Sequence, residues 1–289
     1  MFRSQTDAGL LWMLRATALA AGMIVVLIAL FVALESVPAL SDLGLRRFFS
    51  DRSWHPAGGA TAGQYNLTPM LVGTVAASIG AVLVATPLGV ASALFGRFFA
   101  PSPVATAYRR LMGVLSGIPS VVYGFWGLVT LAPLIRAWHP PGQSLLAAVL
   151  ILAIMILPTI ALLSESALRA VPESYLRGAT ALGLSRWAKI RGVALPAARS
   201  GIFTAVLLAT GRAVGETMAV LMVAGNVVQV PQGLFDSIRT ITANIALELG
   251  YAAEFHRSSL FVSGLALLCL IVAIVGFANW IGRRSGYHE

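Results

Sequence analysis

The sequence predicts an all-α polytopic membrane protein with six transmembrane helices and both termini in the cytoplasm. Hydrophobic residues make up 58% of the 289 residues and charged residues only 11%, whereas soluble domains carry roughly 25% charged residues. The hydrophobic residues are gathered into six runs, each long enough to cross a hydrocarbon core of about 30 Å. Arginines gather in every second segment between these runs, as the positive-inside rule requires of cytoplasmic loops.

The six apolar runs are bounded by polar, charged or glycine-rich segments. We expect the membrane helices at residues 16–34, 67–95, 111–134, 144–163, 201–225 and 258–281. The first run is too long for a secretory signal and no convincing small-residue cleavage site follows it, so we expect an uncleaved helix. Pro87 is expected to kink the second helix and Pro119 to interrupt the third, because proline lacks the N–H that a helix needs.

The charges between the runs predict the side of the membrane on which each segment lies. We expect the cytoplasmic segments at 1–15, 96–110 and 165–200, with a short tail at 283–289. We expect the external loops at 35–66, where the charges balance, at 226–257, which is slightly acidic, and at 135–143, a short turn with one arginine. Membrane topology therefore explains the formal net charge of +9 without nucleic-acid binding.

The longest cytoplasmic segment, 165–200, is polar and rich in arginine. Pro172 is a favourable helix start, Gly183 breaks a helix, and a second short helix can begin at Ser185. We therefore expect two short helices joined at Gly183. Such a compact knob is suited to docking into a groove on another protein.

Two charged residues, Arg212 and Glu216, lie inside the fifth run. Their spacing of one helical turn predicts that both point to the same face. Because a charge near the bilayer centre costs about 2.5–3.5 kcal/mol, such residues face protein or an aqueous path. The planar fork of Arg212 suits an oxyanion, with Glu216 holding the guanidinium while the site is empty. The alternative is a buried ion pair that fixes helix register. Gly211 and Gly215 form a Gly-x-x-x-Gly pair that favours close helix packing.

Residues that carry enzyme or metal chemistry are sparse and scattered. The single cysteine, Cys269, lies inside an apolar run, so neither an intramolecular disulfide nor a thiolate metal site can form. The four histidines show no metal-ligand spacing. The only lysine, Lys189, lies outside any Gly-Lys-[Ser/Thr] phosphate loop. We expect no catalytic residues, no metal site, no bound cofactor and no hydrolysis of ATP by this chain.

The spacing within segment 165–200 resembles that of the cytoplasmic coupling loop of ABC-importer permeases. The family pattern is Glu-Ala-Ala, three residues, Gly, nine residues and Ile-x-Leu-Pro. The corresponding residues here are Arg177, Gly178, Ala179, Gly183, Val193, Leu195 and Pro196. The glycine and the Leu-Pro pair match, whereas arginine stands near the place of the family's glutamate. The resemblance implies that this loop couples the chain to ATPase subunits.

Two stretches within the apolar runs resemble one branch of that family more closely. They read GRAVGETMAV from Gly211 to Val220 and GIPSVVYG from Gly117 to Gly124. Both are similar to the PstC family of phosphate-specific ABC-importer permeases. In the sister PstA family the Glu-Thr pair is followed by Ala-Pro rather than by Met-Ala.

The resemblance implies a type I permease fold and a division of the chain. Residues 1–66 would form an N-terminal membrane helix and an external loop, and 67–282 the permease core with the coupling loop at 165–200. Residues 283–289 would be the cytoplasmic tail. In that family the intramembrane arginine and glutamate are implicated in phosphate passage, which points to Arg212 and Glu216.

The same resemblance implies the partners and the compartment. A PstA-like second permease, two PstB-like ATPase subunits and a periplasmic PstS-like phosphate-binding protein would assemble with this chain in the bacterial inner membrane. The ATPase subunits would hydrolyse the ATP, and movement of the coupling loop would rock the membrane helices between outward-open and inward-open states.

Other functions fit parts of the sequence. A permease for sulfate or molybdate fits as well at Arg212, because one arginine does not distinguish oxyanions, and the sister PstA family is a second candidate. An ATP-independent anion carrier or channel leaves the spacing from Gly183 to Pro196 unexplained. A membrane-embedded enzyme needs a cluster of acids, histidines or a nucleophile at one membrane face, and the sequence offers none.

Overall fold

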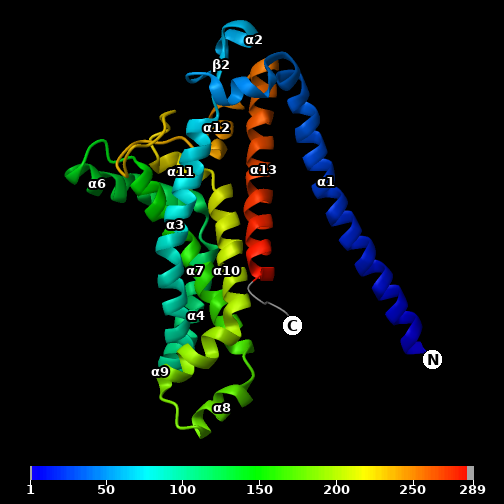
Figure 1. Ribbon diagram of the computed structural model, residues 1–289, viewed down its shortest axis with the longest axis vertical. Helices are drawn as coiled ribbons and strands as arrows, with labels where there is room; N and C mark the ends of the chain where they lie inside the picture. The colour runs from blue at the N-terminus through cyan, green and yellow to red at the C-terminus, as the bar shows by residue number, and fades with distance from the viewer. Residues whose placement is uncertain (1, 285–289) are drawn as a thin grey trace. The chain divides into compact units, whose positions relative to one another are not determined.

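The computed structural model describes residues 2–284, which are almost entirely helical (Figure 1). Two strands of two residues each, β1 (Trp54–His55) and β2 (Gln64–Tyr65), pair antiparallel. The chain forms two compact units. The first takes in the chain up to Asn66 together with Glu248–Cys269, and the second takes in Leu67–Leu247 and the chain from Leu270.

Six helical segments of the described residues are long and apolar enough to cross a membrane, which confirms the number expected from the sequence. They are Gly9–Ser50, Thr68–Phe99, Ser120–Trp138, Leu145–Ala170, Arg186–Gly215 and Glu254–Ala278. The chain is therefore a multi-pass membrane protein. The last helix, α13 (Glu254–Arg284), takes in the start of the expected tail at 283–289, and residues 285–289 lie outside the described part.

The first helix is much longer than the sequence predicts. α1 runs over Phe2–Ser50, so the prediction of a loop from residue 35 is wrong for the stretch up to Ser50. Gly44, with φ 69° and ψ 151°, marks a kink where two helices meet. The rest of the predicted loop holds the two strands and two short helices, η1 (Pro56–Gly58) and α2 (Gly59–Ala62).

α1 passes Pro38 because a side chain replaces one backbone hydrogen bond. In a regular helix the N–H of Ala39 would donate to the carbonyl of Glu35. Instead Ser258 of α13 lies between them, where its Oγ accepts from Ala39 N at 3.1 Å and donates to Glu35 O at 2.7 Å. An inserted hydroxyl is a recognised cause of a helix bend. The helix continues because a residue far away in the sequence satisfies both groups.

In the second unit, α7 (Leu145–Ala170) is the central helix. It packs against α3 (Thr68–Leu94), α4 (Ser102–Gly117) and α10 (Leu195–Gly215) (Figure 1). α3 and α7 approach closely because two glycines of α3 face branched side chains of α7. A Cβ built on Gly80 would lie 2.6 Å from Val149 Cγ2, and one on Gly89 would lie 2.8 Å from Ile160 Cγ2. Small residues at the contact are typical of helix packing in membranes.

The third membrane crossing begins later than the sequence predicts. α4 ends at Gly117, and a new helix starts after Pro119, so the candidate span is Ser120–Trp138 and the predicted limits of 111–134 are wrong. The crossing consists of α5 (Ser120–Trp126), η3 (Gly127–Leu131) and α6 (Ala132–Trp138). The physical reason is that Pro119 cannot continue the helix before it.

Replacing Ser258 by alanine should lower the free energy of unfolding by about 1–3 kcal/mol, because a buried N–H and a C=O lose their partner. Thermal unfolding of the detergent-solubilised chain, followed by tryptophan fluorescence, measures the change. The matched control is Ser259→Ala, since Ser259 is also buried but its hydroxyl donates only to Phe255 O of its own helix. Equal losses in both variants would contradict the inserted-hydroxyl role.

Candidate functional site

The helix that carries Arg212 stops before it reaches Glu216. α10 ends at Gly215, Glu216 has an extended backbone with φ −68° and ψ 130°, and α11 begins at Met218 and runs to Val223. The prediction that Arg212 and Glu216 share one helix face is therefore wrong. The two residues belong to opposite sides of a helix break.

The break is stabilised by polar side chains that satisfy freed backbone groups. The Glu216 carboxylate accepts the N–H of Ala219 at 3.1 Å, as a helix-capping side chain does. Thr242 Oγ1 donates to the Glu216 carbonyl at 2.8 Å. The carboxylate thus serves the first turn of α11. Among the described residues the structure shows no ion pair between Glu216 and Arg212.

Arg212 has a hydroxyl partner in place of a carboxylate. Its Nη1 donates to Thr159 Oγ1 of α7 at 3.3 Å, and both residues are half-buried. Thr159 directly follows Pro158, which interrupts the hydrogen-bond ladder of α7. The guanidinium charge is therefore not neutralised by any carboxylate of the described chain. A guanidinium without a carboxylate partner, inside a membrane-spanning segment, can bind an anion.

A tyrosine from a second interrupted crossing packs against the helix that carries this arginine. Tyr123 of α5 is buried, and its hydroxyl donates to Leu115 O of α4 at 2.7 Å, across the break at Pro119. Tyr123 belongs to the same buried apolar cluster as Ala209 and Ala213, which flank Arg212 on α10. Interrupted helices at membrane depth are tolerated where protein buries them or where they line an aqueous path. The two interrupted crossings pack against each other, α5 against α11, next to the helix that carries Arg212.

Segment 226–257, which the sequence predicts as a loop, also contains a buried helix. It contains α12 (Ile241–Glu248), whose first residues Ile241, Ala243 and Asn244 are fully buried. Ile241 N donates to Thr74 Oγ1 of α3 at 3.1 Å. Arg239 holds the chain before α12, donating through Nε to Asn226 O at 2.9 Å and through Nη1 to Asn244 Oδ1 at 3.0 Å.

Sequence reasoning missed several residues that build the site. They are Thr74, Thr159, Arg239, Thr242 and Asn244, and the role of Tyr123 was left open. The available signal was polar side chains inside or beside apolar runs, such as Thr159 directly after Pro158 and Tyr123 one helical turn after Pro119. The partners of these side chains depend on contacts distant in the sequence.

The coupling segment folds as two short helices joined at Gly183, as the sequence predicts. α8 runs over Glu173–Ala181 after Pro172, and α9 runs over Arg186–Lys189. Gly183 has φ +73°, a conformation that favours glycine. The hydroxyl of Ser185 accepts the N–H of Ala188 at 3.3 Å and caps α9. η4 (Ile190–Ala194) then leads into α10.

Three large apolar side chains are exposed on this otherwise polar segment. Leu182 is 82% exposed, Trp187 60% and Tyr175 58%. A cavity of about 220 Å³ lies beside them, lined by Phe98, Glu173, Leu176, Arg177, Thr180, Arg186 and Lys189. Exposed apolar side chains beside a cavity suit an interface with another protein.

The residues that the resemblance selects for coupling fall into two groups. Those at the surface are Arg177, Gly178, Gly183 and Pro196, whereas Ala179 is buried and Val193 and Leu195 are half-buried. Arg177 pairs with Glu173 at 3.7 Å, with both side chains well exposed. Such exposed pairs contribute little to stability, so Arg177 is available to a partner.

Interrupted membrane helices around an arginine, with an exposed two-helix loop at one end, define a transporter subunit rather than an enzyme. Residues 85–287 match the family model described as "Binding-protein-dependent transport system inner membrane component". The chain belongs to this family. Membership implies that it works with ATPase subunits and a substrate-binding protein.

Two relatives and one solved structure extend this result. The chain is 37% identical over 241 residues to the probable ABC transporter permease protein YqgH of Bacillus subtilis, covering 82% of this chain and 77% of YqgH. It is 35% identical over 268 residues to the phosphate transport system permease protein PstC of Mesorhizobium japonicum, covering 85% and 80%. An inward-facing structure of the MetNI methionine ABC transporter matches with a TM-score of 0.57 at 21% identity, covering 75% of this chain and 93% of that chain. This last likeness concerns the fold alone.

Replacing Glu216 by alanine should lower the free energy of unfolding by about 1 kcal/mol, since the first turn of α11 loses its cap. The amide of Ala219 should then exchange its hydrogen faster, as measured by hydrogen–deuterium exchange. Glu216→Gln is the matched control, because the amide oxygen still accepts the same hydrogen bond. Unchanged protection of the Ala219 amide in both variants would contradict the capping role.

Proposed function

We propose that the chain is the transmembrane permease subunit of an ATP-driven importer that moves inorganic phosphate from the periplasm to the cytoplasm. The observation that carries the proposal is Arg212, whose guanidinium bonds a threonine hydroxyl and no described carboxylate. The similarity to a permease named for phosphate transport supports phosphate as the anion. The partners would be a PstA-like permease, two PstB-like ATPases and a PstS-like binding protein in the bacterial inner membrane, with both termini of this chain cytoplasmic.

The geometry suggests how the anion would engage. Thr159 is an uncharged partner, so an incoming phosphate can replace it at the guanidinium without breaking an ion pair. A planar guanidinium donates two parallel hydrogen bonds to such an oxyanion. Because the helix breaks at Pro119 and Glu216 flank this position, α5 and α11 can shift relative to α4 and α10 without unwinding a continuous helix. Movement of α8 and α9 by the ATPases would drive that shift.

Replacing Arg212 by glutamine should abolish uptake while leaving assembly intact, because the anion loses its cationic partner. The measurement is uptake of radiolabelled phosphate into proteoliposomes that hold the full set of partners, with and without internal ATP. Arg212→Lys is the matched variant, since it keeps the charge but lacks the planar fork, and it should retain a reduced rate. Full uptake by Arg212→Gln would remove the path-lining role.

The same assay separates the alternatives. ATP-dependent uptake that ignores excess sulfate supports the phosphate importer. ATP-dependent uptake that excess sulfate blocks would support an ATP-driven importer of another oxyanion. Uptake without ATP would favour an ATP-independent carrier.

Gly183→Val should uncouple ATP hydrolysis from transport, since a β-branched residue in the left-handed region costs roughly 1–2 kcal/mol and distorts the joint of α8 and α9. The readout is the ratio of phosphate imported to ATP hydrolysed. Asparagine tolerates this conformation, so Gly183→Asn is the control and should stay coupled. An unchanged ratio in Gly183→Val would count against docking at this loop.

A further inference from the structure

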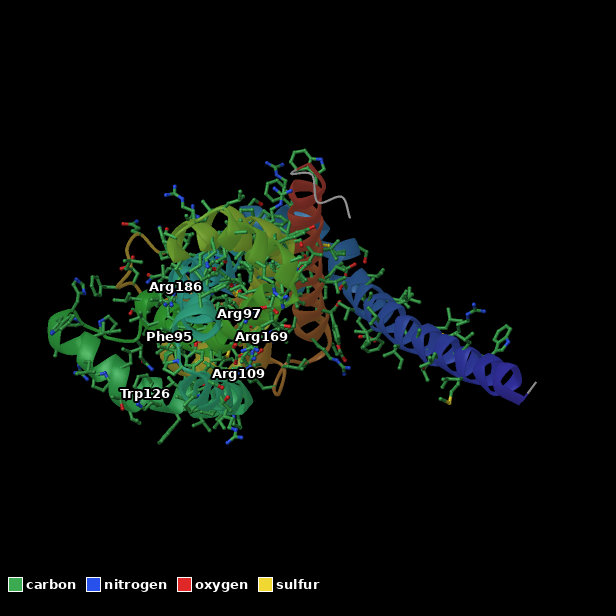
Figure 2. The ribbon with its side chains drawn as sticks, turned by 90° about the horizontal axis from the view of Figure 1, so that it is seen from below. Phe95, Arg97, Arg109, Trp126, Arg169 and Arg186 are labelled. Carbon is green, nitrogen blue, oxygen red and sulfur yellow. The ribbon has the colours of Figure 1, made fainter. Side chains whose placement is uncertain are left out.

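Arginines from several elements surround a single buried carboxylate at the α8/α9 end of the second unit. Figure 2 looks onto this end and shows Arg97, Arg109 and Arg169 gathered over the helix bundle. Glu165 of α7 is 2% exposed. Its Oε1 accepts from Nη2 and Nε of Arg169 at 2.7 and 3.0 Å, whereas Nη1 of Arg109 is 3.9 Å away. The single negative charge of Glu165 therefore neutralises only part of the positive charge of Arg109 and Arg169.

Arg97 adds an unsatisfied donor to this cluster. It belongs to η2 (Phe95–Phe99), and a Cβ built on the preceding residue, Gly96, would lie 3.7 Å from the carboxyl group of Glu165. Nε of Arg97 is buried and has no hydrogen-bond partner among the described residues. A buried charged donor without an acceptor is costly. The position thus lacks an acceptor that a ligand would supply.

Hydroxyl groups complete the polar surroundings. Tyr108 of α4 and Ser92 of α3 are hydrogen-bonded to each other beside this carboxylate. Burial raises the pKa of Tyr108 above its usual value, and the negative charge of Glu165 adds to the shift. The phenol therefore stays protonated at neutral pH and keeps its ability to donate.

We propose that Arg97, Arg109 and Arg169 form a binding site for a tetrahedral phosphate group, separate from Arg212. Guanidinium forks match the oxygens of such a group, and basic pockets at the cytoplasmic ends of membrane helices suit them. Positive-inside topology explains the number of arginines here but neither the buried, unsatisfied Nε of Arg97 nor the carboxylate that Arg109 and Arg169 share. The phosphate group comes either from the transported anion as it leaves or from an anionic lipid headgroup. The first source rests on the proposed function.

The test uses the full chain in phosphatidylcholine nanodiscs, with Arg212→Gln present so that Arg212 does not contribute. Binding of radiolabelled inorganic phosphate is compared in Arg97→Gln, Arg109→Gln and Arg110→Gln. Each of the first two should weaken binding at least about tenfold, because a hydrogen bond to a charged group contributes about 1.5–3 kcal/mol. Arg110 is exposed and next to Arg109 in the chain, so its variant is the matched control and should bind as before.

A variant that binds phosphate more tightly provides a test that misfolding cannot explain. Glu165→Gln removes the charge that competes for the arginines, so it should strengthen phosphate binding by up to about fivefold, the range of a partly exposed ion pair. A folded Glu165→Gln chain that gains neither phosphate binding nor retention of phosphatidylglycerol would contradict the site.

A second arm identifies the source of the phosphate group. Native mass spectrometry counts phosphatidylglycerol molecules retained from mixed nanodiscs. Retention lost in Arg97→Gln and Arg109→Gln, with no binding of inorganic phosphate, supports a lipid headgroup. Equal phosphate binding and equal lipid retention in all variants would overturn the site. The outcome is independent of uptake, because failed uptake with an intact cluster counts only against the proposed function.

Discussion

Within a membrane, every helix break frees backbone N–H and C=O groups that hydrocarbon cannot satisfy. At three interruptions of the helical hydrogen bonding in this chain, a side chain satisfies freed backbone groups. Ser258 bridges Ala39 and Glu35. Tyr123 and Thr242 donate to carbonyls beside two other breaks. These three side chains therefore serve the backbone.

That constraint leads directly to the candidate site. Because Glu216 is committed to the first turn of α11, its carboxylate is not the partner of Arg212. The guanidinium is left with Thr159, an uncharged group that an anion can replace. The same feature that terminates α10 therefore leaves a positive charge available within the membrane-spanning part of the chain.

Local signals allowed much of this to be predicted from the sequence. Hydropathy predicted the number of crossings, and Pro172, Gly183 and Ser185 predicted both helices of segment 165–200. The failures were tertiary in origin. The helix beyond Pro38 depends on Ser258, and the break at Glu216 is held by Thr242. The family motif drew attention to Arg212 and Glu216 but did not show that a helix end separates them.

The central claim is that the unneutralised guanidinium of Arg212 receives the transported anion. The most direct measurement is ³¹P–¹⁵N dipolar-recoupling NMR of phosphate bound to the assembled transporter with ¹⁵N-labelled arginine. Arg97 and Arg109 would be replaced by glutamine so that they do not contribute. The account predicts a coupling between phosphate and arginine side-chain nitrogens that is lost in Arg212→Gln. A coupling that persists in Arg212→Gln would contradict the account. So would the absence of any coupling in the transporter that keeps Arg212.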